Sequence, residues 1–127
     1  MSKEQFVTVI NCMDGRTQLP VIEWLKSRTG ASYVDNVTEP GPGAILAADV
    51  DKWLVESIKR RVGISVQKHR SNLVAIVGHY DCAGNPVNEE TQRKQILKAI
   101  QKIASWGFGV EVIGLWVDEN WQVKRVS

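Results

Sequence analysis

The sequence predicts an α/β fold, with a mostly parallel central sheet of about four strands, an antiparallel edge strand, and helices on both faces. Short runs of apolar and β-branched residues alternate with amphipathic segments in the order β, α, β, α, β, α, β, β. The last two runs are separated only by the polar segment 118–120, which favours a hairpin. Because 127 residues suffice for one hydrophobic core, we expect a single domain over 1–127.

The first strand is predicted over residues 6–12, where the run is nearly continuous in apolarity, as in strands buried on both faces. A helix is predicted over 18–29. Pro20 is tolerated in its first turn, and Gly30 is a good C-terminal cap. The chain should therefore cross from the first strand to a second, parallel one.

The second strand is weaker and is predicted over residues 33–37. The following segment 39–43 contains two prolines and two glycines, which predict a turn at the same edge of the sheet. A helix should then occupy 50–69, with Asp49 or Asp51 as its N-cap, and Gly63 could break or end it early.

The third strand is predicted over residues 73–78, again as a buried apolar run. A helix over 89–105 follows Asn88 and carries its apolar residues on one face. The hairpin is predicted to pair residues 110–117 with 121–126. Its terminal strand would form an exposed edge of the sheet, which favours a homodimer or a higher homo-oligomer.

The only two cysteines lie where predicted strands end. Cys12 closes the first strand, and Cys82 follows the third strand three residues after His79. If these strands are parallel neighbours, two thiolates and one imidazole meet at one sheet edge. These are ligand types that zinc prefers, and three protein ligands with a vacancy are typical of a catalytic zinc site. Two buried core thiols are the simpler alternative.

Two charged residues follow Cys12 on the same predicted loop. Asp14 could coordinate the metal as a fourth ligand, or it could accept a hydrogen bond from a metal-bound hydroxide. Arg16 is close enough in sequence to hold Asp14 in a fork-shaped, charge-assisted pair. This pair would decide whether Asp14 blocks the metal or leaves the fourth position to water.

Composition excludes several other classes of function. A formal net charge of +2, with lysine and arginine scattered over the predicted helices, gives no electrostatic footprint for nucleic acid. No apolar run is long enough for a signal peptide or a membrane span, so a cytoplasmic location is expected. In that reducing compartment a metal site is favoured over a disulfide.

The motif formed by Cys12, Asp14, Arg16, His79 and Cys82 resembles the zinc and dyad motifs of the β-class carbonic anhydrases. The resemblance covers most of the chain in the family's order, as a short, minimal member, through the segments 34–36, 77–79 and 112–126. At one position, where the family usually has arginine near the cleft, this chain has Asp35.

The resemblance implies a function and a role for each residue. Cys12, His79 and Cys82 would bind Zn²⁺, while Asp14 and Arg16 would form the catalytic dyad that orients a zinc-bound hydroxide. That hydroxide would hydrate carbon dioxide to bicarbonate.

Three alternatives remain. The chain could be a zinc-binding domain of the same fold without carbonic anhydrase activity. It could be a hydrolase of a related small substrate such as carbonyl sulfide or carbon disulfide. A cysteine-nucleophile enzyme is disfavoured, because only three residues separate Cys12 from Arg16.

Overall fold

The computed structural model describes residues 4–127 and confirms the predicted α/β architecture. Residues 1–3 belong to the expected domain but lie outside the described residues. The strands are β1 (Phe6–Cys12), β2 (Tyr33–Glu39), β3 (Leu73–His79), β4 (Glu111–Val117) and β5 (Val123–Arg125). The helices are α1 (Gln18–Thr29), α2 (Pro42–Ala48), α3 (Lys52–Lys68) and α4 (Glu89–Ala104).

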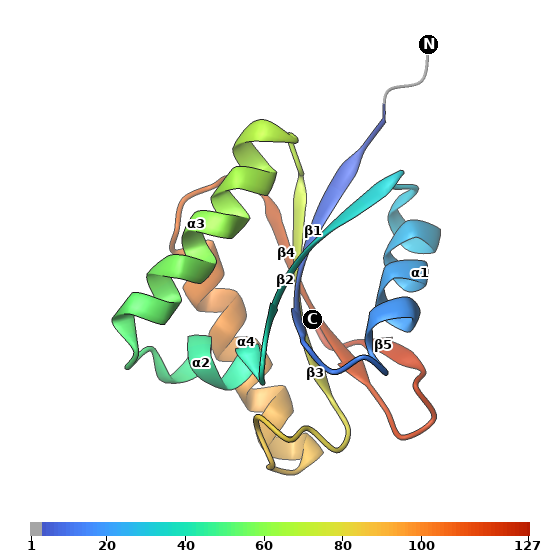
Figure 1. Cartoon of the computed structure of the whole chain (residues 1–127), viewed down its shortest axis with the longest axis vertical. Helices are drawn as coiled ribbons and strands as arrows, with labels where there is room; N and C mark the ends of the chain where they lie inside the picture. Colours follow the sequence, from blue (N-terminus) through green and yellow to red (C-terminus); the bar gives the residue numbers. More distant parts are fainter. Residues whose placement is uncertain (1–3) are drawn as a thin grey trace.

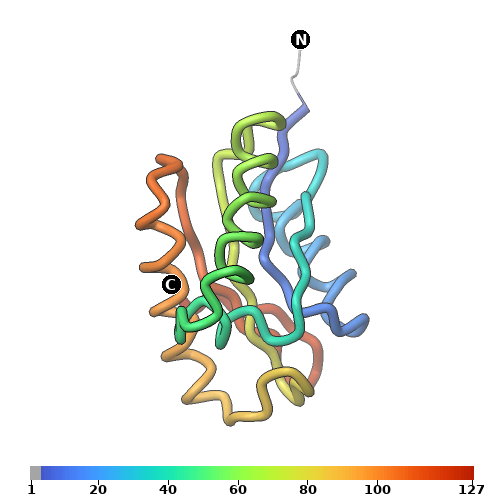
Figure 2. Tube along the Cα trace, turned by 60° about the vertical axis from the view of Figure 1, so that its left-hand side comes forward, coloured from blue at the N-terminus to red at the C-terminus, as the bar shows by residue number. Residues whose placement is uncertain are grey.

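The five strands form one sheet in the order β2-β1-β3-β4-β5 (Figure 1). The first four strands are parallel, and only β5 pairs antiparallel, to β4. The central position of β1 and β3 as parallel neighbours confirms the pairing on which the predicted metal site depends. The carboxyl ends of these strands lie at the end of the molecule away from the chain's N-terminus (Figure 2).

Helices cover both faces of the sheet, but unequally. The helix α1 packs on one face, while α2, α3 and α4 pack on the other (Figure 1). The alternation of strand side chains explains this division, since Val7 and Val9 of β1 join the core beneath α1, and Ile10 joins the core beneath the other three helices. Both halves of the core are therefore built on the same buried strands.

The helix α4 lies close to the sheet because two strand residues have no side chain. A Cβ atom on Gly78 of β3 would lie 2.9 Å from Gln92 and 3.0 Å from Ile96. A Cβ atom on Gly114 of β4 would likewise overlap Ile96 and lie 3.0 Å from Ile100. This close approach places the N-terminal half of α4 against the end of β3.

The structure differs from the sequence-based expectations in two local features. The segment predicted as a turn over 39–43 instead completes β2 and starts the short helix α2, with Pro42 at its first position, where a missing N–H costs nothing. Gly63 does not end α3, which continues to Lys68 because Gly63 is buried where the ring of Phe108 fills the space beside it. Asp51 caps α3 as expected, through a 3.1 Å bond from the Leu54 amide to its side chain.

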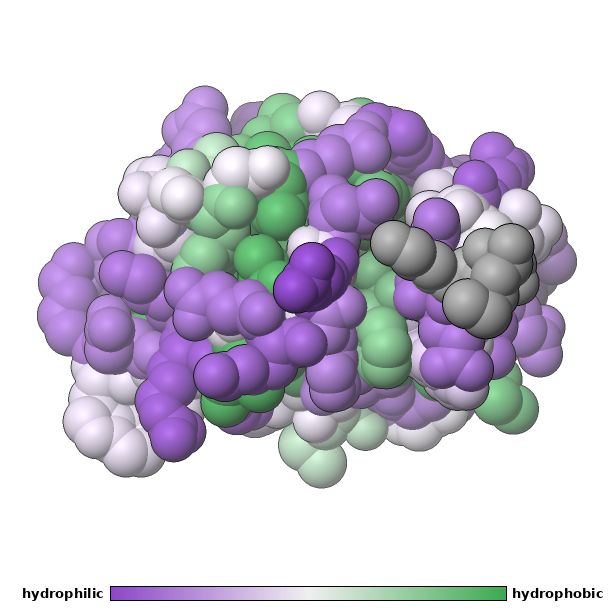
Figure 3. Space-filling model, turned by 90° about the horizontal axis from the view of Figure 1, so that it is seen from above, coloured by the Kyte–Doolittle hydropathy of each residue, from purple (hydrophilic) through white to green (hydrophobic). Residues whose placement is uncertain are grey.

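The surface at the amino-terminal end of the sheet is largely hydrophilic, with apolar residues visible in several separate places between the polar ones (Figure 3). Among the described residues, no helix combines the length and apolarity needed to cross a membrane. The chemistry-bearing residues singled out above lie at the opposite end.

Candidate metal centre

The register of the central strands brings Cys12 and His79 together. Ile10 of β1 pairs with Ile76 of β3, so two further positions place Cys12 beside Gly78, and His79 comes next. A turn then carries Cys82 back over the end of the sheet. All three side chains are buried.

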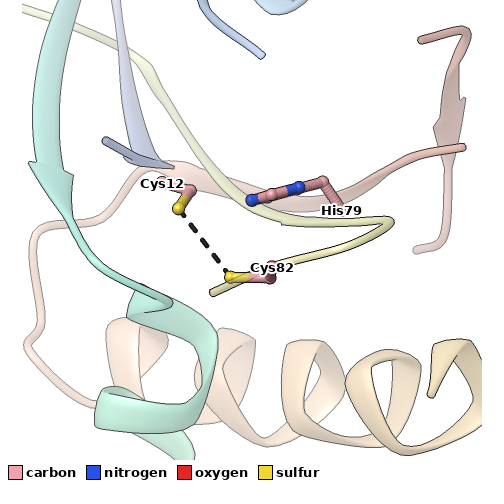
Figure 4. A group of neighbouring side chains, drawn as sticks. All are labelled: Cys12, His79 and Cys82. Carbon is pink, nitrogen blue, oxygen red and sulfur yellow. Dashed lines mark hydrogen bonds between the residues drawn. The ribbon is translucent and has the colours of Figure 1, made fainter. Parts of the chain in front are cut away.

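The three predicted ligands form one compact group. The Sγ atoms of Cys12 and Cys82 lie 3.8 Å apart, and one ligand atom from each of Cys12, His79 and Cys82 lies within 4.8 Å of the others (Figure 4). No other group of three or more histidine, cysteine or acidic side chains with this proximity occurs within residues 4–127. Both cysteines are free thiols.

The orientation of the His79 ring is fixed by its backbone neighbour. Nδ1 lies 2.7 Å from the carbonyl oxygen of Tyr80, which can only accept, so Nδ1 carries the proton. In the neutral ring Nε2 then presents its lone pair toward the two thiols. Nε2 is buried and has no hydrogen-bond partner. A buried nitrogen with an unused lone pair is unfavourable unless something binds it.

The geometry matches what zinc requires. Two Zn–S bonds of about 2.3 Å at a tetrahedral angle separate the sulfurs by about 3.8 Å, which is the separation of the Cys12 and Cys82 sulfurs. The proton on Nδ1, held by a backbone carbonyl, is the arrangement that orients a metal-binding histidine. The residues present therefore fit a zinc ion with three protein ligands.

The electrostatics of the site favour a thiolate at Cys12. Burial opposes its ionisation, but the imidazole of His79 and the backbone amides of Gly41 and Asp14 lower the pKa of Cys12 to about 7. Burial also opposes the charged form of His79, but the neighbouring Cys12 raises the pKa of His79 above its usual value. The pKa of Cys82 is raised by burial and by the negative charge of Cys12.

Asp14 is held by Arg16 in the predicted fork-shaped pair. Arg16 Nη2 lies 2.7 Å from Asp14 Oδ2, and Arg16 Nε lies 3.0 Å from Asp14 Oδ1. The Arg16 amide also donates to Oδ1 at 2.9 Å. Hydrogen bonds from Arg16 outweigh burial and lower the pKa of Asp14 to about 2. Asp14 is thus a carboxylate at neutral pH, with its oxygens directed to Arg16.

The loop that carries Cys82 packs tightly on the loop before α2. Gly41 adopts a φ of +61°, and a Cβ atom on it would lie 2.7 Å from Asn85. A Cβ atom on Gly84 would lie 2.7 Å from Pro40. These close contacts fix the position of Cys82 relative to the end of β2. The sequence showed both glycines but not that they meet.

Three polar side chains hold the ligand-bearing backbone in place. Gln92 of α4 accepts from the His79 amide at 3.1 Å and donates to its carbonyl at 2.8 Å. Gln18 donates to the Cys12 carbonyl at 2.7 Å. Asn11 accepts from the Cys12 amide at 2.8 Å. No sequence pattern indicates this role for the three residues, because it depends on their proximity in the folded chain.

Asp35 lies away from the site, contrary to its expected place near the cleft. Asp35 lies four residues before Glu39 in β2, and Glu39 is the residue that pairs with Cys12. Its Oδ2 accepts from Ser65 at 2.7 Å and lies 2.6 Å from His69 Nδ1. The reversed charge at this position therefore serves the packing of α3 on β2.

Comparisons with known proteins agree with this geometry. A family model described as "putative carbonic anhydrase" matches residues 2–127. No curated protein matches the sequence.

Solved structures show the same fold at low sequence identity. A β-carbonic anhydrase of Trichomonas vaginalis is 13% identical with a TM-score of 0.58, over 99% of this chain and 87% of that one. One of two tetrameric β-carbonic anhydrases of Sordaria macrospora is 13% identical with a TM-score of 0.60, over 98% and 81% of the two chains. An apo form of a carbon disulfide hydrolase is 12% identical with a TM-score of 0.61, over 98% and 79%.

At these identities the structures establish the fold, while the family model establishes membership over nearly the whole sequence. With its β-carbonic anhydrase fold and its Cys-His-Cys cluster, the chain belongs to the family described as "putative carbonic anhydrase".

Proposed function

We propose that this protein binds Zn²⁺ through Cys12, His79 and Cys82 and hydrates carbon dioxide to bicarbonate. The observation that carries the proposal is the buried, unpartnered Nε2 of His79 beside two sulfurs at tetrahedral spacing. Zinc held by three protein ligands supplies hydroxide near neutral pH for attack on a carbonyl-type carbon.

The chain's own residues support catalysis over a purely structural site. The Asp14 carboxylate accepts hydrogen bonds from Arg16 through both of its oxygens, so it does not have to serve as a fourth ligand of the metal. With its pKa of about 2, Asp14 remains an acceptor at every pH at which the enzyme would work. An acceptor held two residues after the ligand Cys12 could accept the nucleophile's proton and thereby orient its lone pair toward the substrate.

The proposal is tested by zinc analysis and stopped-flow hydration of carbon dioxide. The wild type should hold one zinc ion per chain and show a rate that rises from neutral to alkaline pH, because the two thiolates oppose ionisation of the nucleophile. Cys82→Ser should lose the metal and the rate. Asp14→Ala should keep the metal and lose about 10²-fold or more in kcat. Glu56→Ala, at an exposed position on α3, is the matched control.

A zinc-loaded wild type with no hydration rate at any pH would contradict the proposal. The fold shared with a carbon disulfide hydrolase makes that substrate the second candidate. Carbon disulfide and carbonyl sulfide should therefore be assayed in parallel on the same preparation. Turnover of either one without turnover of carbon dioxide would assign the site to sulfur-containing substrates.

We also propose that the protein forms a homodimer or higher homo-oligomer. One sheet edge is the seven-residue strand β2, whose outer backbone groups have no neighbouring strand among the described residues. The other edge, β5, has only three residues, so it is a weaker pairing surface than expected. Light scattering after gel filtration gives the mass, and a monomer at micromolar concentration would contradict this assembly.

A further inference from the structure

Arg16 contacts three loops around the candidate metal centre. Within its own loop, which follows β1, Arg16 donates a hydrogen bond to the Asp14 carboxylate. Its Nη2 also donates to the backbone carbonyl of Asp81 at 3.1 Å, and its Nη1 lies 3.3 Å from Asp81 Oδ2, in the loop after β3. Its Cζ lies 4.6 Å from the ring centroid of Trp121, in the turn between β4 and β5.

The contacts from the other two loops set where Asp14 lies. Asp14 and Arg16 are two residues apart, so their mutual pair could move as a unit with its own loop. Only contacts from outside that loop can fix the pair relative to Cys82 and His79. Asp81 precedes Cys82 directly, and the ring of Trp121 lies 6.5 Å from the ring of His79. Both residues therefore tie Arg16 to the metal ligands.

The backbone at these two contact residues is strained. Asp81 and Trp121 have φ angles of 57° and 58°, in a region that non-glycine residues rarely adopt. They are two of only four such non-glycine residues among the described part of the chain, and both contact Arg16. Strain that the surrounding structure maintains is concentrated at functional sites.

The turn that carries Trp121 is held rigidly. Asp118 accepts from the amides of Asn120 and Gln122, each at 2.9 Å, and its carbonyl accepts from the Trp121 amide at 2.9 Å. Trp121 also packs against the core beneath α1. The indole is thus a fixed surface against which the guanidinium of Arg16 can rest.

We propose that Trp121 and Asp81 are positioning residues that hold Arg16 from one face and one edge, so that Asp14 stays directed to Arg16 and away from the metal ligands. The inference rests on the proposed function, because it assigns these residues to the same site. The guanidinium of Arg16 donates to the Asp14 carboxylate and to the carboxylate and backbone carbonyl of Asp81, and the cation–π contact fixes its plane. Without these anchors Asp14 and Arg16 would remain paired but would lose their fixed position relative to Cys82 and His79.

The test compares Trp121→Leu, Trp121→Phe and Asp81→Asn with two matched controls. Trp53→Leu makes the same substitution at an indole that is 80% exposed, and Glu119→Gln removes an exposed acid from the same turn as Trp121. The first readout is the ¹⁵N NMR signal of Arg16 Nε–H, which exchanges slowly only when the guanidinium is held. The second is kcat and KM for hydration by the zinc-loaded protein.

In Trp121→Leu the Nε–H signal should broaden or disappear, and kcat should fall roughly tenfold at unchanged zinc content and KM. Asp81→Asn should show the same changes with a smaller fall, about threefold, because its side chain is exposed. Trp121→Phe should keep most of the Nε–H signal and most of the wild-type kcat, because phenylalanine still offers an aromatic face to Arg16. Both controls should match the wild type.

Wild-type signals and rates in both Trp121→Leu and Asp81→Asn would overturn the inference. If the wild type bound zinc but failed to hydrate carbon dioxide, the proposed function would fall, while the Arg16 signal would still decide whether the two residues hold Arg16. If circular dichroism showed that Trp121→Leu does not fold, Asp81→Asn and Trp121→Phe would decide in its place.

Discussion

At the scale of single residues, the protonation of three side chains sets the conditions for metal binding. Zinc needs thiolates and a neutral imidazole, so any proton on these atoms must leave when the metal binds. The pKa values of Cys82 and His79 lie above their usual values, and that of Cys12 is about 7. Below pH 7 the metal-free site is therefore largely protonated.

We predict that zinc binding at pH 6.5 releases between two and three protons per chain, so that affinity falls by more than about a hundredfold for each unit of pH lost below neutrality. The sign follows from the three pKa values, because each group holds more of its proton as the pH falls. Above pH 7 the dependence should become shallower as Cys12 ionises. Calorimetric titration in buffers of different ionisation enthalpy counts the protons.

His69→Asn provides the control for this measurement, because His69 pairs with Asp35 and lies outside the ligand group. It should leave the proton count unchanged. Release of less than one proton at pH 6.5 would show that the thiols do not ligate the metal.

At the scale of secondary-structure elements, the close packing of α4 on the sheet positions His79 through Gln92. Gly114→Ala should push α4 outward, because the new Cβ would overlap Ile96. We expect a loss of about 1–3 kcal/mol in the free energy of unfolding, typical of overpacking in a rigid core. Urea denaturation followed by circular dichroism measures it.

Gly43→Ala is the matched substitution, because a Cβ at that position in α2 would contact nothing within 4 Å. It should be neutral or slightly stabilising, since alanine favours a helix over glycine. Equal stability of Gly114→Ala and Gly43→Ala would mean that α4 can shift away from the sheet freely.

The sequence was sufficient to predict the elements that depend on hydrophobic periodicity. The buried run over β3 and the amphipathic pattern of α4, with Asn88 as its N-cap, have strong local signals. The helix α2 was missed because Pro42 and its neighbouring glycines are compatible with both a turn and a helix N-terminus. Seven residues are too few for periodicity to decide between them.

The sequence predicts the positions of site residues only where these residues lie at the ends of strands. Cys12 and His79 sit at or beside the carboxyl ends of adjacent strands, so parallel pairing alone brings them together. The contacts of Asp81 and Trp121 with Arg16 depend instead on positive φ angles in two loops, a conformation that tryptophan does not favour and that aspartate adopts only in a minority of cases. No pattern in the sequence indicates such strain, because tertiary contacts impose it.

At the scale of the whole molecule, the candidate metal centre lies at one end of a hydrophobic core that does not include its three side chains. The two halves of the core are formed by aliphatic side chains of the sheet and all four helices, independent of Cys12, His79 and Cys82. Small zinc domains whose core is insufficient unfold without metal. This chain should instead retain its fold when zinc is removed and lose only the link between the loops after β1 and β3.

Removing zinc with a chelator should therefore lower the Tm without changing the far-ultraviolet circular dichroism at 25 °C. A ligand that binds only the folded state at a thousandfold above its Kd stabilises it by about 4 kcal/mol, which corresponds to a shift on the order of 10 °C for a domain of this size. Added zinc should restore the Tm of the wild type but leave that of Cys82→Ser unchanged, because the variant has lost a ligand.

Loss of secondary structure on chelation would show that the metal is needed for folding. An unchanged Tm, with zinc removed and confirmed absent by elemental analysis, would show that the two loops are held together by protein contacts alone, such as those of Gly41 and Gly84.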